Sequence, residues 1–290
     1  MTTALVSAPR RGFLARKANS IGLRSIGRTA VDCLILELET WPKPGLVSHI
    51  DAGSHVDMDA GTFRASARAI APYLEAMAEA GASGGSMSQL RLIGMEAETA
   101  MLTATGGVNT HRGAIFGLGL LCAAAGARVS GKADPMSSLG SIVSTAWGKD
   151  ILDGPVLLHS HGSRARLRFG AGGARKEAAA GFPTIYEVGL PVLRKVGGKM
   201  AHCAHAARVQ ACFALIARLE DTNLLHRGGL VGLQYAQRAA RGFLSHGGVL
   251  ATGWKAHALV VHQNFISRRL SPGGSADLLA FSLFVNSQDG

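Results

Sequence analysis

Apolar residues recur along this chain at the three- and four-residue spacing of amphipathic helices. Within residues 26–40, Val31, Leu34, Ile35 and Leu38 fall on one face, and two prolines that follow end the helix. We find no segment with the two-residue alternation of a strand, and no hairpin signal or internal repeat. The pattern predicts an all-α protein, built as a single-domain multi-helix bundle with polar, glycine-rich loops between the helices.

The same periodicity predicts most of the remaining helices and sets the first residues apart. The first 28 residues contain six Lys or Arg and no acid, without the apolar region of a signal peptide. We therefore expect residues 1–28 to be a flexible basic leader and residues 29–290 to be one all-helical domain. Helices are expected from Asp57 or Asp59 to Ala80 and over residues 89–102, 110–125, 136–147, 174–180, 184–196, 204–219, 228–244, 249–267 and 275–285.

The net charge of the chain indicates which classes of ligand it can bind. The formal net charge is +11 and the sequence pI is about 10.1, which favours anionic ligands. Only 6% of the residues are aromatic, and the basic residues form no stripe, so we do not expect nucleic acid as a partner. The longest apolar stretch is interrupted by glycines and too short for a comfortable membrane span, so we expect no membrane partner.

Cysteine usage indicates the compartment. The four cysteines form no CxxC pair, and each lies among apolar residues. Buried free thiols in a reducing cytosol explain this better than disulfides or a zinc site. We expect a cytoplasmic protein, and a homodimer is compatible with the sequence.

Polar and glycine residues gather in short segments at the predicted helix ends. Loops of this kind at one end of a bundle form a polar pocket walled by helix N-termini, whose free N–H groups favour anions. The segments are KPGLV (residues 43–47), HIDAGSHVDMD (49–59), TGGVNTHRG (105–113), GAGGARKEAAAGF (170–182), DTNLLHRGG (221–229) and LSPGGSAD (270–277).

The segment 105–113 places hydrogen-bonding residues directly before an apolar helix. Asn109 and Thr110 are suited to capping that helix, while Gly106 and Gly107 allow close approach of the backbone to a ligand. His111 adds a hydrogen-bonding ring. Plain capping accounts for the segment equally well.

A candidate metal site lies in the segment 49–59. Asp57 and Asp59 supply carboxylate oxygens, which Mg²⁺ prefers, often shared with substrate phosphates. Glu98 is a third candidate, because it could face the same pocket as Asn109. The alternative is that the aspartates only cap a helix.

Two further segments offer cations and carboxylates. Arg175 suits a phosphate fork, and Glu177 follows it. Helix capping explains Asp221 but leaves the rest of its cluster unexplained. That cluster continues with Asn223, His226 and Arg227. The chain has no P-loop or GxSxG motif, so it does not resemble a P-loop or kinase-type phosphoryl transferase.

Taken together, KPGLV, HVDMD, TGGVNTHRGAIFGLGLL, GARKEAAAGF, DTNLLHRGG and LSPGGSADLLA resemble the sequence blocks of the triphosphoribosyl-dephospho-CoA synthase family. They occur in the family's order from about residue 30 to residue 285, and the TGGVNTHRGAIF block is the most specific. The segments 46–59 and 270–280 are more similar to the malonate decarboxylase branch than to the citrate lyase branch. The basic leader has no part in the resemblance.

The resemblance implies an all-helical pentosyltransferase whose substrates are ATP and 3′-dephospho-CoA. It would move the 5-triphosphoribosyl group of ATP to the 2′-hydroxyl of the acceptor and release adenine. The product would be the precursor of the prosthetic group of an acyl-carrier subunit. Cleavage of the N-glycosidic bond needs an acid for adenine, a base for the hydroxyl and cations for an intact triphosphate.

We assign hypothetical roles on this basis. Asp57, Asp59 and Glu98 would hold Mg²⁺; Lys43, Arg175 and Arg227 would contact phosphates; and Asp221 or Glu177 would be the base. His111 would act at the reacting centre or orient the ribose or base together with Asn109 and Thr110. The other candidate substrate-binding residues are Gly106, Gly107, Asn223, His226 and Ser275.

Two other functions remain open at this point. A metal-dependent N-glycoside hydrolase acting on an ADP-ribose-like substrate would use the same carboxylates with water as acceptor. A non-enzymatic helical module that docks on an acidic carrier protein would explain the charge, but not the polar loops.

Overall fold

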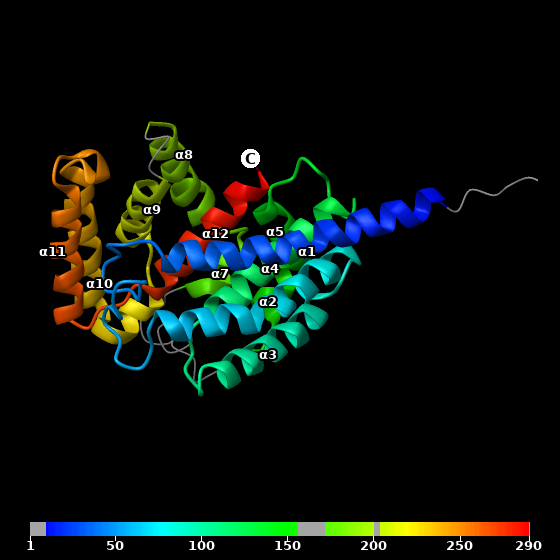
Figure 1. Ribbon diagram of the computed structural model, residues 1–290, viewed down its shortest axis with the longest axis horizontal. Helices are drawn as coiled ribbons and strands as arrows, with labels where there is room; N and C mark the ends of the chain where they lie inside the picture. The colour runs from blue at the N-terminus through cyan, green and yellow to red at the C-terminus, as the bar shows by residue number, and fades with distance from the viewer. Residues whose placement is uncertain (1–9, 156–171, 200–203, 290) are drawn as a thin grey trace, which may run out of the picture.

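The protein is all-helical, as the apolar pattern predicted. The computed structural model describes residues 10–155, 172–199 and 204–289, and contains eleven α-helices and no strand within these ranges (Figure 1). The helices are α1 (Arg10–Leu38), α2 (Ala60–Ala82), α3 (Met87–Ala104), α4 (Arg112–Val129), α5 (Leu139–Asp153), α7 (Gly173–Ala179), α8 (Leu190–Lys199), α9 (Ala204–Arg218), α10 (Thr222–Ser245), α11 (Trp254–Ser267) and α12 (Gly273–Gln288). A π-helical turn, η1 (Ile185–Gly189), precedes α8, and a 3₁₀ turn, η2 (Gly248–Leu250), precedes α11.

Helix α1 begins inside the segment that we expected to be a leader. It runs from Arg10 to Leu38 without interruption. The division at residue 28 therefore remains a prediction. Residues 170 and 171 of the segment 170–182 lie outside the described part of the chain, as does Cys203.

Two groups of helices are joined by α12. Helix α2 packs against α1, α3 and α4, and α9 packs against α8 and α10. Helix α12 contacts α1 and α4 of the first group and α9 of the second, and it runs between them (Figure 1). The buried apolar side chains form one continuous cluster across both groups. The N-terminus of α12 thus lies where the two groups meet.

Helix α4 is the central helix of the first group. Within the described ranges it alone is long and apolar enough to cross a membrane by length and composition, but 72% of that stretch is buried inside the fold. Its contact with α2 depends on Gly81 and Gly126, because a Cβ on either would overlap the backbone of the other helix. Its apolar composition is therefore explained by burial in the core.

Local signals explain where two of the site-forming helices begin. Asp59 caps α2 in a reciprocal capping box with Thr62, as one of the two predicted caps. Asp221 caps α10, so this helix begins six residues before the expected start at Gly228. Gly229 has φ 60° and ψ −161°, and helical structure resumes beyond it. Gly229 therefore divides α10 into two helical parts, and the second begins close to the expected start at Gly228.

Candidate active site

Five polar residues meet inside the fold where α1, α10 and α12 come together. We call this set, Glu37, Lys43, Asp221, Ser275 and Asp277, the polar core. Glu37 lies in the last turn of α1, Lys43 in the loop after it, Asp221 at the N-cap of α10, and the other two in the first turns of α12. The first four are at most 5% exposed, and Asp277 is partly accessible. Buried charged groups at this density need mutual compensation, or they destabilise the fold.

Lys43 and Glu37 form a buried ion pair. The ammonium Nζ of Lys43 donates to Oε1 of Glu37 at 2.5 Å, and the two side chains are 1% and 7% exposed. Burial raises the pKa of Glu37, and the positive charge and hydrogen bond of Lys43 oppose that rise. Lys43, expected from the sequence to contact phosphate, is thus engaged with a carboxylate in the structure.

Asp221 joins two helix N-termini. Its Oδ1 accepts hydrogen bonds from the backbone N–H groups of Asn223 at 2.9 Å and Leu224 at 3.4 Å. Its Oδ2 accepts from the backbone N–H of Ser275 at 2.8 Å and from the Ser275 hydroxyl at 3.1 Å. Burial raises the pKa of Asp221, and these hydrogen bonds oppose the rise. Both oxygens are therefore already supplied with donors by the protein.

Asp277 lies beside the same groups without such donors. It accepts no hydrogen bond and forms no ion pair with any residue that the structure describes. Burial, followed by the nearby negative charges of Glu37 and Asp221, raises the pKa of Asp277 well above its usual value. Its Oδ2 lies against Gly113 in the first turn of α4, where a Cβ would overlap it. A third helix N-terminus therefore reaches the polar core.

His111 is buried next to this centre, at the N-cap of α4. Its Nδ1 lies 2.6 Å from the hydroxyl of Ser66, and its ring packs edge-on against Phe63 at 5.0 Å between centroids. Burial, and then the charge of Lys43, lower the pKa of His111 to about 4. The imidazole is therefore neutral at pH 7, so one ring nitrogen can donate a hydrogen bond and the other can accept one.

The loop before α4 caps that helix only in part. The side chain of Asn109 accepts a hydrogen bond from the backbone N–H of Arg112 at 3.2 Å. Thr110 Oγ1 is the one buried side-chain polar atom without a partner within the described ranges. Gly106 and Gly107 have φ of 63° and 91°, and both face open space. These glycines are thus required by the backbone turn, and the loop surface is accessible.

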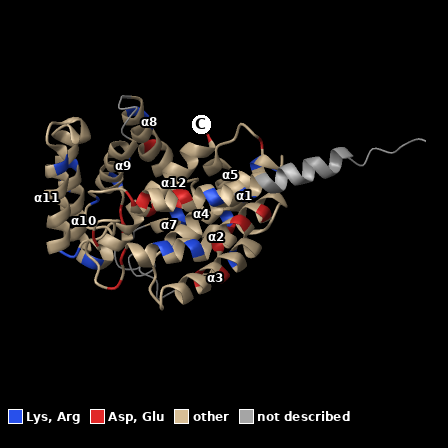
Figure 2. Cartoon of the chain, viewed as in Figure 1, with Lys and Arg blue, Asp and Glu red and all other residues tan. Residues whose placement is uncertain are grey.

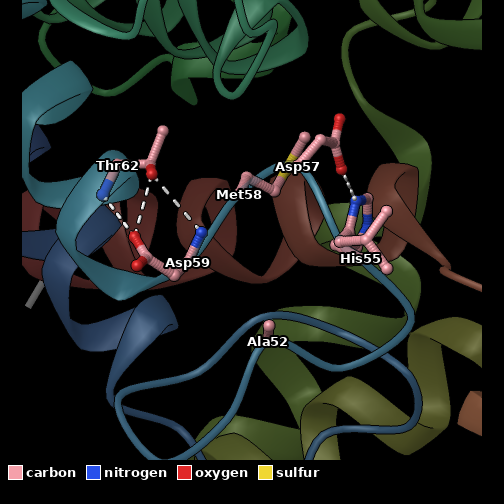
Figure 3. Close-up of a pocket in the computed structure, with 7 residues that line it drawn as sticks. Ala52, His55, Asp57, Met58, Asp59 and Thr62 are labelled. Carbon is pink, nitrogen blue, oxygen red and sulfur yellow. Dashed lines mark hydrogen bonds and ion pairs between the residues drawn. The ribbon is translucent and has the colours of Figure 1, made fainter.

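The predicted carboxylates Asp57 and Asp59 line one open cavity of about 290 Å³, which we call the rim cavity. Figure 3 shows the Asp57 carboxylate turned toward His55, at 3.4 Å from its Nδ1, and Asp59 turned onto Thr62. Hydrogen bonds from Thr62 lower the pKa of Asp59. Asp57 is 57% exposed, so it is available to a ligand, while Asp59 also serves as the helix cap.

His55 connects the rim cavity to α10 and to the start of α12. Its Nε2 lies 2.9 Å from the Ser271 hydroxyl, and its Nδ1 lies 3.2 Å from the guanidinium of Arg227. Arg227 also donates to the carbonyls of Ser54 at 3.2 Å and Arg269 at 3.3 Å. The structure thus brings Asp57 and Arg227 together through His55, a histidine of the same polar segment 49–59. In Figure 1 the loop after α1 accordingly lies beside α10.

The other predicted residues have separate surroundings. Glu98 on α3 accepts from Arg112 at 2.9 Å and is not among the residues lining the rim cavity. Arg175 donates to carbonyls at the end of α5, including those of Pro155 at 3.0 Å and Gly154 at 2.8 Å. Glu177 accepts from the backbone N–H of Thr184 at 2.8 Å, and burial raises its pKa. These contacts do not test the predicted roles of Glu98 in metal binding, of Arg175 in phosphate binding and of Glu177 in base catalysis.

Asn223 and His226 lie on the first two turns of α10. A Cβ on Gly273 would come within 2.7 Å of the Asn223 amide nitrogen, so this side chain faces the start of α12. His226 is exposed beside Arg227. Asn223 thus lies at the start of α12, and the substrate-binding roles of both residues stay predictions.

Glu37 and Asp277 were missed in the sequence, although a signal for both was present. Glu37 continues the buried stripe of Ile26, Ala30 and Cys33 along α1 at helical spacing. Asp277 precedes Phe281 and Phe284, both buried, by four and seven residues on α12. A carboxylate on the apolar stripe of a helix was the available signal. Asp51, which bonds the Trp41 indole at 3.1 Å and lies 3.1 Å from His262, was also missed as an anchor of the loop.

The arrangement favours polyanionic ligands beside a cluster of carboxylates. The N-termini of α4, α10 and α12 converge on the polar core, and helix N-termini carry partial positive charge. Basic and acidic residues are interspersed over the helices in the view of Figure 2. The anion preference therefore comes from helix ends and single cations, not from a basic stripe.

Comparison with known proteins identifies the family. The family model of ATP:dephospho-CoA triphosphoribosyl transferase matches residues 23–290. A protein of Stutzerimonas stutzeri described as a probable 2-(5″-triphosphoribosyl)-3′-dephosphocoenzyme-A synthase is 40% identical over 94% of each chain. The synthase of that name from Klebsiella pneumoniae is 38% identical over 93% of each chain, and a probable one from Azotobacter vinelandii is 42% identical over 89% of each. No solved structure matches the chain significantly.

The chain belongs to the ATP:dephospho-CoA triphosphoribosyl transferase family. It is an enzyme that transfers a triphosphoribosyl group from ATP to dephospho-CoA and so forms a prosthetic-group precursor. This confirms the family resemblance of the sequence blocks, while the choice between the malonate decarboxylase and citrate lyase branches stays a prediction.

Proposed function

We propose that the polar core and the rim cavity together form the active site, and that the 2′-hydroxyl of 3′-dephospho-CoA attacks C1′ of ATP there and displaces adenine. The observation that carries this proposal is the convergence of three helix N-termini on buried carboxylates. Helix N-termini suit a triphosphate, and carboxylates suit a reacting carbon that becomes positive. Few other reactions of ATP need both in one place.

The proposed reaction also explains why the chain has no P-loop. The C1′–N9 bond of ATP breaks and the phosphoanhydride bonds stay intact, so a P-loop is not required. Positive charge develops at the anomeric carbon in the transition state, by analogy with O-glycosides. The carboxylates of the polar core would stabilise that charge, and the positive end of α4 would face the polyanionic part of the substrate.

The residues of the site would have separate roles in this reaction. Arg227, anchored by the Ser54 and Arg269 carbonyls, is positioned at the rim to contact phosphate oxygens. Neutral His111, with Asn109 and Thr110, would orient the ribose or base, and the unpaired Thr110 hydroxyl is free to accept or donate there. Lys43 limits the negative charge of the polar core through Glu37. Arg175 keeps its proposed role in binding phosphate, and Glu177 remains the alternative to the polar core as the source of the base.

Mg²⁺ would enter with the triphosphate of ATP. Asp57 and Asp59 line the rim cavity, and two carboxylates fit a cation whose other ligands are phosphates and waters. No group of three or more His, Cys, Asp or Glu within the described ranges is arranged as a metal site. The ion would therefore be held mainly by the substrate, with Asp57 as its principal protein ligand and Glu98 as a further candidate. It would supply neutralisation of phosphate charge.

We further propose that the product serves the acyl-carrier subunit of malonate decarboxylase. The resemblance of residues 46–59 and 270–280 to that branch supports this target, and citrate lyase is the alternative. Deleting the gene and weighing the acyl-carrier subunits of the host by mass spectrometry separates the two. Loss of the prosthetic group from the citrate lyase carrier alone would contradict the malonate decarboxylase assignment.

The same proposal places the reaction in the cytoplasm. The buried free thiols of Cys33, Cys122 and Cys212 support a reducing compartment.

The mass of the acceptor tests the reaction. Purified protein is incubated with ATP, Mg²⁺ and 3′-dephospho-CoA, and CoA carrying the 3′-phosphate serves as the matched control acceptor. We expect 3′-dephospho-CoA to gain the mass of one triphosphoribosyl group and CoA to remain unchanged. An acceptor that gains a phosphoryl or adenylyl group would contradict the proposal.

A further inference from the structure

Asp277 differs from the other two carboxylates of the polar core in its hydrogen bonding. Glu37 is bound to Lys43, and Asp221 receives donors from Asn223, Leu224 and Ser275. Asp277 accepts from no residue that the structure describes. A carboxylate that no protein donor occupies can accept a hydrogen bond from a ligand.

The fold makes room for this carboxylate. Gly113 lies in the first turn of α4, and a Cβ there would overlap Oδ2 of Asp277. The carboxylate therefore rests against the start of α4, next to the segment 105–111 that carries Asn109, Thr110 and His111. As a residue it is partly accessible, in contrast to Glu37 and Asp221.

From this geometry we propose that Asp277 is the catalytic base that accepts the proton of the attacking hydroxyl. The inference rests on the proposed function, which it deepens by naming the base. The 2′-oxygen of the acceptor forms a bond to C1′ of ATP, and the C1′–N9 bond breaks with its electron pair going to adenine. The hydroxyl proton passes to the Asp277 carboxylate, adenine takes up one proton from water at a ring nitrogen, and Asp277 later returns its proton to water. The total number of protons is unchanged.

The surroundings of Asp277 make its carboxylate more basic than that of an ordinary aspartate. Glu37 faces it from α1 and Asp221 from the start of α10, and both negative charges, together with burial, raise its pKa. Lys43 and neutral His111 are the other titratable groups at this centre. A raised pKa makes the ionised carboxylate a stronger base than an ordinary aspartate. Asp221, whose oxygens already accept four hydrogen bonds, acts as the positioning residue for the α12 N-terminus.

Replacement of Asp277 by asparagine tests the proposal. We expect Asp277→Asn to lower kcat for adenine release by about 100-fold or more, with the Kd of ATP changed by less than about threefold. The wild-type kcat should rise with pH through the coupled titration of Asp277, Glu37 and Asp221, and this limb should be lost in the variant. Asp289→Asn, at the other end of α12 and paired with Arg128, is the matched control and should retain wild-type turnover.

A second variant leaves the carboxylate in the chain. Gly113→Ala places a methyl group where Oδ2 of Asp277 lies, so it should reduce kcat while the carboxylate is still present. If Asp277→Asn does not fold, this variant and the wild-type pH profile test whether Asp277 is the base.

The outcomes separate the two proposals. An active wild type with a folded Asp277→Asn variant of near wild-type kcat would overturn the role of Asp277 and leave the proposed function standing. A wild type that modifies no acceptor would overturn the proposed function and this inference with it. If Asp277→Asn does not fold, wild-type turnover in Gly113→Ala with no rising limb in the pH profile would also overturn the role of Asp277.

Discussion

Oδ2 of Asp221 accepts hydrogen bonds from both the backbone N–H and the hydroxyl of Ser275, at 2.8 and 3.1 Å. These residues lie 54 positions apart in the sequence, at the N-termini of α10 and α12. The carboxylate that caps one helix therefore fixes the start of the other. This contact places Asp277, two residues after Ser275, beside Glu37 and Gly113.

Removing the Ser275 hydroxyl should weaken this connection measurably. We expect Ser275→Ala to reduce the free energy of unfolding by about 1 kcal/mol, because a hydrogen bond to a buried carboxylate is lost. The melting temperature should fall by about 2–4 °C for a chain of this size. Thermal unfolding followed by circular dichroism measures both.

Ser287 provides the control on the same helix. Its hydroxyl donates to the Phe284 carbonyl at 2.7 Å, away from the polar core. Ser287→Ala should change stability by less than about 0.5 kcal/mol. Equal melting temperatures for Ser275→Ala and the wild type would contradict the connection.

The Lys43–Glu37 pair should be strongly coupled in stability. Lys43→Met leaves the Glu37 carboxylate buried and unpaired, which should cost about 3–5 kcal/mol. The double variant Lys43→Met with Glu37→Gln should recover most of this loss, because the uncompensated charge is removed. A denaturant-based double-mutant cycle measures the coupling, and additive effects of the two changes would count against the pair.

Asp57 should act as a ligand of Mg²⁺, whereas Asp59 should stabilise the fold. Asp57→Ala should abolish turnover or raise the Mg²⁺ concentration needed for it, without loss of stability, because the side chain is exposed at the rim cavity. Asp59→Ala should lower the melting temperature through loss of the α2 cap.

Parallel Mg²⁺ titrations and melting curves distinguish these two effects. Full activity of Asp57→Ala at every Mg²⁺ concentration would exclude Asp57 as a ligand.

His111 should make the fold sensitive to acid. Its pKa falls from 6.5 to about 4 on folding, so the unfolded chain binds a proton in this interval that the folded protein does not. The stability from the neutral imidazole is present above pH 6.5 and is lost as the pH falls toward 4. Since one proton over one pH unit is worth about 1.4 kcal/mol, the loss should reach about 3 kcal/mol.

Substitution isolates the contribution of His111. In His111→Gln this part of the pH dependence of the unfolding free energy should be absent, while in His49→Gln, which changes an exposed histidine, it should remain. A His111→Gln protein with the wild-type slope between pH 6.5 and 4 would show that another group titrates there.

Residue patterns were sufficient for the fold class and for contacts close in sequence. The three-four periodicity depends only on burial, so it predicted helices throughout, and Asp59 capped α2 because Asp followed by a helix-forming run is a local signal. The expected start at Gly228 matches the second helical part of α10, and the first part, capped by Asp221, was not predicted as helix. Gly229, with φ 60° and ψ −161°, separates the two parts.

Groups of side chains that meet only in three dimensions were harder to predict. The segments 43–47, 221–229 and 270–277 were recognised as polar, and the structure brings residues of all three to the polar core. Glu37 lies outside these segments, and its ion pair with Lys43 depends on how the loop after α1 folds back. Arg175 also binds carbonyls at the end of α5, a contact that charge alone does not reveal, and its phosphate role stays a prediction.

The dependence of adenine release on the acceptor tests the central claim most directly. The purified protein is mixed with ATP and Mg²⁺, with and without 3′-dephospho-CoA, and adenine is followed by chromatography. The account predicts that adenine appears only when the acceptor is present, in equal amount with triphosphoribosylated acceptor. Adenine released at the same rate without acceptor would show hydrolysis of the N-glycosidic bond and would contradict the transferase mechanism proposed for this site.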